Sequence, residues 1–326
     1  MMNITVDDIR GVVGILPTPA TSNADRWDAE NTVNLPESEK MVRGIVEAGT
    51  DVIMTTGTFG QGATLTFEEL RDFVDCVVQT TAKRRPVFAG VTTLNTRDTI
   101  KRGRAMLDVG ADGLFLGRPM WISLDDRNLV KYYRDLAEAL PGVPFVIYDN
   151  PLAFKGNISQ EAYRQLATIP QIVASKHATN PQLEPDLALI GDKIRILPFE
   201  TQWAKLAVKY PDTAVACWSG AVACAPAPIN ALARAIARRD WPAAEAIGER
   251  VNWAVSPMIS GGMSGFMDYS IQLGRERFLA AGFIDPGPSR PPYTEAPEEL
   301  KEGSRECGRR WATLQAEFEK AAAGVA

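Results

Sequence analysis

Eight short apolar segments recur before residue 220 and alternate with longer amphipathic segments, and this alternation constrains the fold more than any other feature. The apolar segments are rich in Val and Ile and are continuous, which is typical of strands buried on both faces of a parallel sheet. The predicted strands cover residues 11–16, 51–56, 86–91, 113–117, 144–148, 172–175, 194–199 and 214–218.

Helix start and stop signals occupy the intervals between these strands. Pro36 begins one predicted helix and Gly49 follows its end, while Thr66 and Glu69 form a capping box for a helix that ends near Lys83. Further helices are predicted over residues 97–109, 126–140, 160–168, 182–190, 202–210 and 227–239. Eight β/α units in about 240 residues predict a (β/α)8 TIM barrel. The alternative, an open doubly wound sheet, is disfavoured because no GxGxxG follows the first strand.

The strands stop after residue 240, so the chain is predicted to have two parts. Residues 1–240 form the barrel, and residues 241–326 form a C-terminal helical extension packed on it. Within the extension, helices are expected over residues 242–259, 269–281 and 298–322, with a Pro/Gly-rich stretch at 286–293.

Composition excludes several classes of function. The 326 residues carry 35 Lys and Arg against 40 Asp and Glu, a net charge of −5 that argues against nucleic-acid or anionic-membrane binding. Four cysteines without a CxxC pair, and no evident signal peptide, favour a reducing cytoplasmic location. The uncharged residues 214–233 are interrupted by Pro and Gly, so they are interpreted as a strand, a loop and a helix start.

The chain has a single histidine, His177, which rules out a multi-histidine metal site. The other hard ligands at predicted strand ends are Asp149 and Glu200, and the three lie on three different strands. No metal is therefore expected. His177 follows Lys176 directly, so strand alternation points it away from the barrel interior, and it is interpreted as structural.

The active site of such a barrel lies at the carboxyl ends of its strands. Lys176 is the one lysine directly at a strand end, where apolar neighbours lower the pKa of the amine and allow it to attack a ketone. Tyr148 ends the preceding strand at an equivalent height and can carry protons. The turn from Gly57 to Gly60 offers backbone N–H groups and the Thr58 hydroxyl to a carboxylate. In isolation these features are also compatible with a solvated lysine, a packing tyrosine and a tight loop.

Three of these segments together resemble the motifs of one enzyme superfamily. Residues 57–61 (GTFGQ) resemble the GTTGE motif of the dihydrodipicolinate synthase/N-acetylneuraminate lyase superfamily, 148–151 (YDNP) its Y-N-x-P motif, and 172–176 (IVASK) its Schiff-base segment. The resemblance covers roughly residues 10–280 and implies a class I, pyruvate-handling barrel, usually a tetramer. It makes Lys176 the Schiff-base lysine, Tyr148 the proton shuttle, and Thr58 with adjacent backbone the holder of the pyruvyl carboxylate.

Departures from these motifs favour an aromatic substrate. Residues 120–121 (MW) stand where the synthases carry a tyrosine pair, and 152–154 (LAF) lack the arginine that binds the carboxylate of their aldehyde substrate. A polyhydroxylated substrate would leave its polar groups unsatisfied here, whereas a flat ring would be well accommodated. The aromatic side chains predicted to surround such a ring are Phe59, Trp121, Phe154 and Trp218.

This combination is similar to the hydratase-aldolases of polycyclic aromatic hydrocarbon degradation, which include trans-o-hydroxybenzylidenepyruvate and trans-2'-carboxybenzalpyruvate hydratase-aldolases. The similarity extends to residues 267–272 (MDYSIQ) and 287–293 (GPSRPPY). It implies that a substituted trans-benzylidenepyruvate forms an iminium on Lys176, is hydrated, and splits into an aromatic aldehyde and pyruvate. Because the iminium is the electron sink, no cofactor is expected.

The sequence gives fewer constraints on the residues that contact the aromatic ring of the substrate. Trp121 and Trp218 are predicted to line its pocket, unless they simply pack the core, and Ser270 and Tyr269 are weaker candidates for contacts to a ring substituent. Arg118 would meet a ring carboxylate or a helix end.

Two other functions remain open. One is a different pyruvate-dependent aldolase or dehydratase acting on a sugar acid, and the other is a non-catalytic protein that binds a pyruvate analogue. The intact pair Lys176 and Tyr148 argues against the second. The expected partners are a small-molecule substrate and further copies of the chain in a homotetramer.

Overall fold

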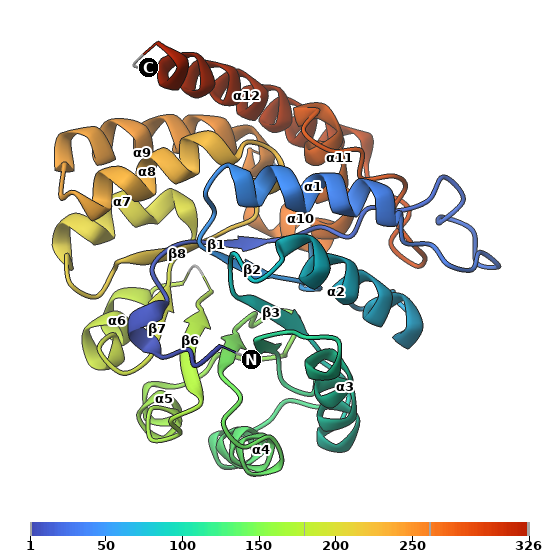
Figure 1. Cartoon of the computed structure of the whole chain (residues 1–326), viewed down its shortest axis with the longest axis vertical. Coiled ribbons are helices and arrows are strands. Elements are labelled where there is room, and N and C mark those ends of the chain that lie inside the picture. The colour runs from blue at the N-terminus through green and yellow to red at the C-terminus, as the bar shows by residue number, and fades with distance from the viewer. Residues whose placement is uncertain (1, 179, 261, 325–326) are drawn as a thin grey trace.

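The structure, a computed structural model that describes residues 2–178, 180–260 and 262–324, contains the predicted barrel (Figure 1). Its parallel strands are hydrogen-bonded in the order β7-β6-β5-β4-β3-β2-β1-β8. A parallel bridge between Phe199 and Trp218, with the Trp218 N–H donating to the Pro198 carbonyl at 2.9 Å, brings β7 and β8 together. The strands are β1 (Gly11–Ile15), β2 (Val52–Met54), β3 (Val87–Gly90), β4 (Gly113–Leu116), β5 (Phe145–Tyr148), β6 (Ile172–Lys176), β7 (Arg195–Leu197) and β8 (Ala216–Ser219).

A helix follows each strand, and the predicted boundaries agree with the structure to within two residues. The capping box before α2 is present: the Glu69 N–H donates to Thr66 Oγ1 at 3.2 Å, and the Thr66 N–H donates to Glu69 Oε2 at 2.9 Å. The helices are α1 (Leu35–Glu47), α2 (Phe67–Thr81), α3 (Thr96–Asp108), α4 (Asp126–Ala139), α5 (Gln160–Leu166), α6 (Leu183–Ile190), α7 (Glu200–Lys209) and α8 (Pro226–Ala237). The TIM-barrel prediction is confirmed.

Strand side chains alternate between the barrel interior and the layer under the helices. Along β1, Val13 and Ile15 belong to the interior cluster, whereas Val12 packs with the helices. In β6 the interior position of Ala174 recurs two residues later at Lys176. The alternation therefore carries the lysine into the mouth of the barrel.

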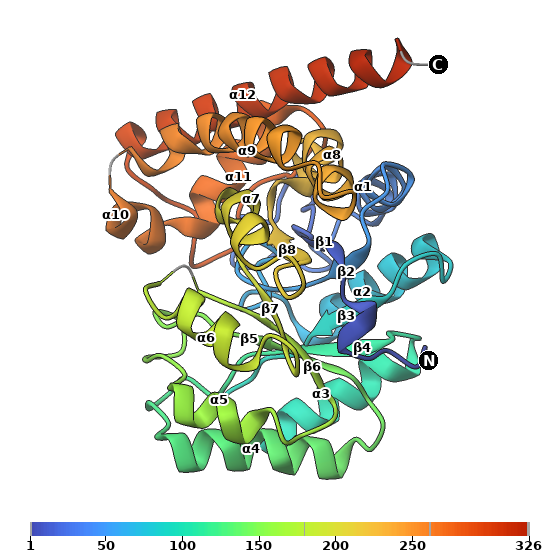
Figure 2. The same ribbon diagram turned by 90° about the vertical axis from the view of Figure 1, so that its left-hand side faces the viewer.

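The residues after α8 form a helical tail along one side of the barrel. Its elements are α9 (Trp241–Val255), η3 (Ser256–Ile259), α10 (Met263–Asp268), α11 (Ser270–Ala281) and α12 (Glu298–Ala323). The short helix α10 was not predicted, because the Gly-rich segment around it carries no helical periodicity. Helix α12 packs on α8, α9 and α11, and the outer hydrophobic cluster continues from the barrel into it. Figure 2 shows α10 on the side opposite the N-terminus.

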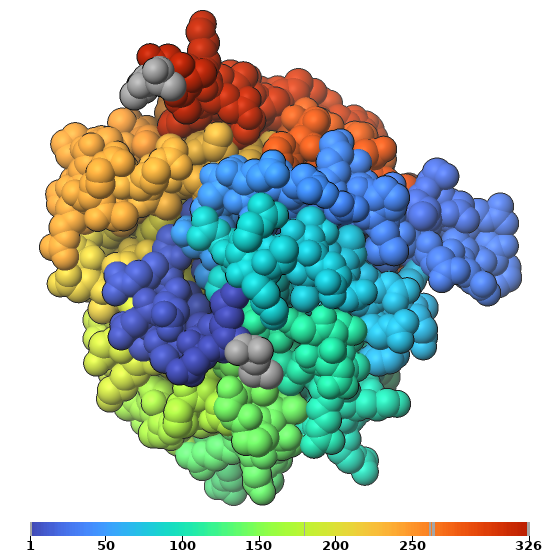
Figure 3. Space-filling model, viewed as in Figure 1, coloured from blue at the N-terminus to red at the C-terminus, as the bar shows by residue number. Residues whose placement is uncertain are grey.

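An arm formed by the segment before α1 projects from the body of the barrel (Figure 3). Trp27 in this arm is 90% exposed. No helix in the described part of the chain is both long enough and apolar enough to span a membrane.

Candidate active site

Lys176 lies at the end of β6 with an aromatic ring on two sides. Its backbone pairs with Tyr148 of β5 and Leu197 of β7, which confirms that Tyr148 stands one strand away at an equivalent height. The amine Nζ lies 3.6 Å from the centre of the Trp218 ring and 4.8 Å from that of Tyr148. Burial lowers the pKa of Lys176 to about 7, although the Asp149 and Glu200 carboxylates oppose the shift. Roughly half of the amine is then neutral near pH 7.

The Tyr148 phenol is held by three polar groups. Its oxygen shares a 2.5 Å hydrogen bond with the Thr58 hydroxyl and accepts from the Thr58 N–H and the Asn150 amide, both at 3.3 Å. Phe115 stacks on the phenol ring with centroids 4.6 Å apart, and Phe154 meets it edge-on at 5.2 Å. The structure thus brings Lys176, Tyr148 and Thr58 together. The contact of Asn150 was not predicted, although its place two residues after Tyr148, just beyond the end of β5, is a signal that could have identified it.

The turn that carries Thr58 is strained at both ends. Thr56 and Gln61 adopt left-handed backbone conformations, with φ of 51° and 52°. Such conformations cost about 1–3 kcal/mol each outside glycine and persist only where the surroundings fix them. The Thr56 hydroxyl donates to the Gly90 carbonyl at 2.8 Å, and Gln61 Oε1 accepts from the Arg290 N–H at 2.9 Å. Neighbouring elements therefore hold the turn in one conformation.

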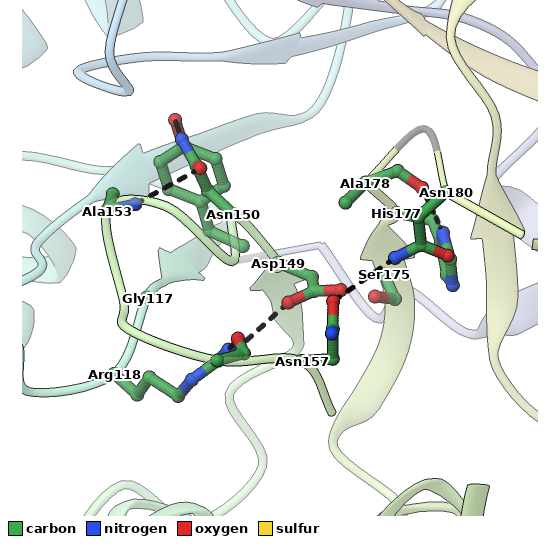
Figure 4. A network of polar contacts seen from close by, with 12 residues as sticks. Gly117, Arg118, Asp149, Asn150, Ala153, Asn157, Ser175, His177, Ala178 and Asn180 are labelled. Carbon is green, nitrogen blue, oxygen red and sulfur yellow. Dashed lines mark hydrogen bonds and ion pairs between the residues drawn. The ribbon is translucent and has the colours of Figure 1, made fainter. Parts of the chain in front are cut away.

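Arg118 follows β4 and binds groups from the loop after β5 (Figure 4). Its Nη1 lies 3.1 Å from Asp149 Oδ1, its Nη2 donates to the Gly156 carbonyl, and both charged side chains are 2% exposed. Burial raises the pKa of the Asp149 carboxyl, and the Arg118 guanidinium opposes that rise. The structure thus pairs Arg118 with Asp149, a partner that was not predicted from the sequence.

His177 points away from Lys176, as predicted. Its Nε2 lies 2.9 Å from Asp186 Oδ2 of α6, its ring stacks on Tyr163 of α5, and the side chain is buried. These contacts fix β6 to two helices behind it. Within residues 2–178, 180–260 and 262–324, no three His, Cys, Asp or Glu side chains are grouped as metal ligands.

The four aromatic residues predicted around a substrate ring occupy different places. Trp218 and Phe154 are nearly buried beside Lys176 and Tyr148. Phe59 turns away toward the tail, where it contacts Phe266 and Phe278. Trp121 is 75% exposed, so within a single chain it does not form an enclosed pocket wall.

A further buried ionisable group, Glu200, lies near the mouth of the barrel, and its burial was not predicted from the sequence. Glu200 begins α7 and is fully buried, and burial raises its pKa to about 7 although the nearby Ser219 hydroxyl and the charge of Arg277 oppose the rise. Arg277 comes from α11 in the tail and donates to the Gly220 carbonyl at 3.2 Å. Arg277 reaches this place because the tail packs on the barrel, and no local sequence pattern predicts that packing.

Ser270 is the first residue of α11 and follows Tyr269, and both side chains are partly buried. One turn later, Gly274 contacts Phe59. The N-terminal half of α11 therefore lies beside Phe59 of the turn that carries Thr58, and contact of Ser270 or Tyr269 with a ring substituent stays a prediction.

The comparisons with known proteins agree with this geometry. The model of the dihydrodipicolinate synthetase family matches residues 12–198. The chain is 49% identical over 320 residues to the trans-2'-carboxybenzalpyruvate hydratase-aldolase of Nocardioides sp. (strain KP7), covering 97% of this chain and 96% of that enzyme. It is 39% identical to the trans-o-hydroxybenzylidenepyruvate hydratase-aldolase of Pseudomonas putida, covering 97% of each.

A solved structure has the same fold over nearly its whole length. The structure of PhdJ bound to a substrate intermediate superposes with a TM-score of 0.95 at 48% identity. The match covers 98% of this chain and 100% of that one, so it includes the helical tail.

Proposed function

The chain belongs to the dihydrodipicolinate synthetase family, and we propose that within this family it is a hydratase-aldolase that cleaves a substituted trans-benzylidenepyruvate. The products are an aromatic aldehyde and pyruvate. One observation carries the proposal: a desolvated lysine, with a pKa of about 7, faces a tyrosine at the same height of the barrel. The full-length similarity to hydratase-aldolases supports the choice of reaction.

The first step joins Lys176 to the substrate. The neutral amine attacks the ketone carbon of the benzylidenepyruvate, and loss of the ketone oxygen as water leaves an iminium. The Tyr148 phenol supplies and recovers the protons of this exchange. Thr58 and its backbone N–H, which already lie against Tyr148, hold the carboxylate next to the ketone.

The iminium then drives hydration and cleavage. It withdraws electrons from the conjugated C=C bond, so water adds its oxygen at the benzylic carbon and a proton at the carbon nearer the iminium. Tyr148 removes the proton of the new hydroxyl, directly or through water, and the bond between these two carbons breaks. The aldehyde leaves, and its bonding electrons form an enamine on Lys176. Protonation of the enamine and hydrolysis of the imine release pyruvate and the free amine.

The aromatic part of the substrate suits the apolar side of the site. Trp218 and Phe154 supply ring faces beside the reacting atoms, where a flat aryl group gains contact area without polar groups to satisfy. Arg118 is already paired with Asp149, so a ring carboxylate would need another partner. Ser270 and Tyr269, at the start of α11, are the candidates for that contact.

The test is turnover of substituted benzylidenepyruvates, followed by loss of their ultraviolet absorbance. We expect Lys176→Ala to reduce turnover at least about 10³-fold, and Lys205→Ala, a change of an exposed lysine on α7, to leave it unchanged. Borohydride with pyruvate should add mass at Lys176 of the wild type. Cleavage that survives in Lys176→Ala, or faster condensation of pyruvate with sugar aldehydes than with benzaldehydes, would contradict the proposal.

The proposal includes a homotetramer. Trp121, Ile122 and Leu152 are 75%, 71% and 65% exposed on the loops after β4 and β5, and an apolar surface of this kind suits a contact between copies. Sedimentation should give a tetramer for the wild type and smaller species for Trp121→Lys. A wild-type monomer would contradict this part.

The proposed location is the cytoplasm. All four cysteines carry free thiols, three of them buried, as expected in a reducing compartment. Fractionation of the native host tests this, and recovery of the enzyme outside the cytoplasmic fraction would refute it.

A further inference from the structure

The side chain of Phe59 occupies a slot that only glycine leaves open. A Cβ atom on Gly274 of α11 would lie 2.9 Å from Phe59 Cδ1, and one on Gly220 after β8 would lie 2.9 Å from Phe59 Cε2. Both distances are too short for carbon atoms in contact. The ring is therefore held from two sides, one in the barrel and one in the tail.

The tail also supplies a third side of the slot. The Arg277 guanidinium carbon lies 4.9 Å from the Phe59 ring centre, within the range of a cation–π contact, and the Phe278 ring meets Phe59 edge-on at 6.3 Å. Arg277 is fully buried, and its Nη2 donates to the Gly220 carbonyl at 3.2 Å. The guanidinium thus links the two glycine-bearing segments and the ring between them.

A second segment of the tail holds the other end of the same turn. The backbone N–H of Arg290 donates to Gln61 Oε1, and the Arg290 guanidinium binds the carbonyls of Thr18 and Thr32 at 3.1 and 2.8 Å. Gln61 is one of the two strained residues of the turn. Tail contacts therefore fix the turn at two residues that follow Thr58, namely Phe59 and Gln61.

We propose that the C-terminal tail is a positioning element of the active site, and that it sets the place of Thr58 by holding Phe59 in the slot between Gly220, Gly274 and Arg277. This inference rests on the proposed function only in taking Thr58 and its backbone as the site of the pyruvyl carboxylate. Phe59 and Arg277 are positioning residues that act through Thr58. Their effect on Thr58 falls on recognition of the carboxylate.

The test fills the slot and compares two ketones. Gly274→Ala places a methyl group against Phe59, whereas Gly265→Ala, in α10, places one 3.6 Å from Leu300 in ordinary contact and serves as the control. Borohydride trapping on Lys176 is measured over a range of pyruvate and of methyl pyruvate, the ester that lacks the carboxylate charge. We expect Gly274→Ala to raise the half-saturating pyruvate concentration about tenfold, with less than about a twofold change for methyl pyruvate and none in the control.

The other outcomes are informative as well. An equal loss for both ketones, or no loss for pyruvate, would overturn the inference. If circular dichroism shows that Gly274→Ala does not fold, Phe59→Leu takes its place. This variant removes the ring that the slot holds, and the same selective loss for pyruvate is expected of it. A wild type that traps neither ketone contradicts the proposed function and the inference together, whereas a wild type that traps pyruvate with unselective variants contradicts the inference alone.

Discussion

Two of the buried cations at the barrel mouth, Lys176 after β6 and Arg118 after β4, differ in their surroundings. Arg118 lies 3.1 Å from the Asp149 carboxylate. Lys176 has no ion-pair partner among the residues that the structure describes, and its amine faces the rings of Tyr148 and Trp218. A guanidinium keeps its proton in a protein, and Asp149 balances the charge of Arg118, whereas an amine can become neutral when it is buried. Between Arg118 and Lys176, pairing therefore distinguishes the structural cation from the reactive one.

The largest effect is expected when the ion pair between Arg118 and Asp149 is removed. Asp149→Leu leaves Arg118 charged and buried without a partner, which should lower the free energy of unfolding by about 3–5 kcal/mol. The double variant Arg118→Met/Asp149→Leu should recover most of that loss, because no charge then remains buried. Urea unfolding of the single and double variants measures both values.

A surface pair is the control for this experiment. Asp212→Ala breaks the exposed pair with Arg239 and should cost less than about 1 kcal/mol. If Asp149→Leu costs no more than Asp212→Ala, or if the double variant is no better than the single one, the paired and unpaired cations do not differ as described.

A smaller effect on stability is expected when the unpaired cation, Lys176, is replaced. Folding lowers the pKa of Lys176 from 10.5 to about 7, so between these values the unfolded chain holds a proton that the folded chain has released. Wild-type stability therefore rises with pH across this window. Lys176→Met, which binds no proton, should be more stable than the wild type near pH 7 by about 1–3 kcal/mol, with the gain fading toward about pH 10. A gain that is constant with pH, measured by urea unfolding, would contradict the assigned shift.

The smallest effect is expected from the action of the nearby carboxylates on the pKa of Lys176. The Asp149 carboxylate raises the pKa of Lys176 against the effect of burial, so Asp149→Asn should move the pH midpoint of borohydride trapping downward by less than about one unit. Glu200→Gln should move it in the same direction, and the exposed Asp212→Asn should not move it. An upward shift in either buried variant would show that these carboxylates do not act on the amine by charge.

The sequence predicted the parts of the site that follow from strand periodicity. Lys176 and Tyr148 each end an apolar strand, and parallel neighbours at the same edge must stand side by side, as their register shows. Thr58 follows in the same way from a glycine-flanked turn after a strand. The exposed position of Trp121 and the pairing of Arg118 were not predicted, because both depend on the conformations of the loops at the barrel mouth.

The amino-acid sequence by itself determined the barrel and its reactive pair, because periods of two and 3.6 residues fix which side chains face inward and where each strand ends. Only the tertiary structure decided what surrounds that pair. Arg277 and Gly274 come from a tail more than 200 residues after the turn they hold. Contacts over such separations come from packing, and local periodicity carries no information about them.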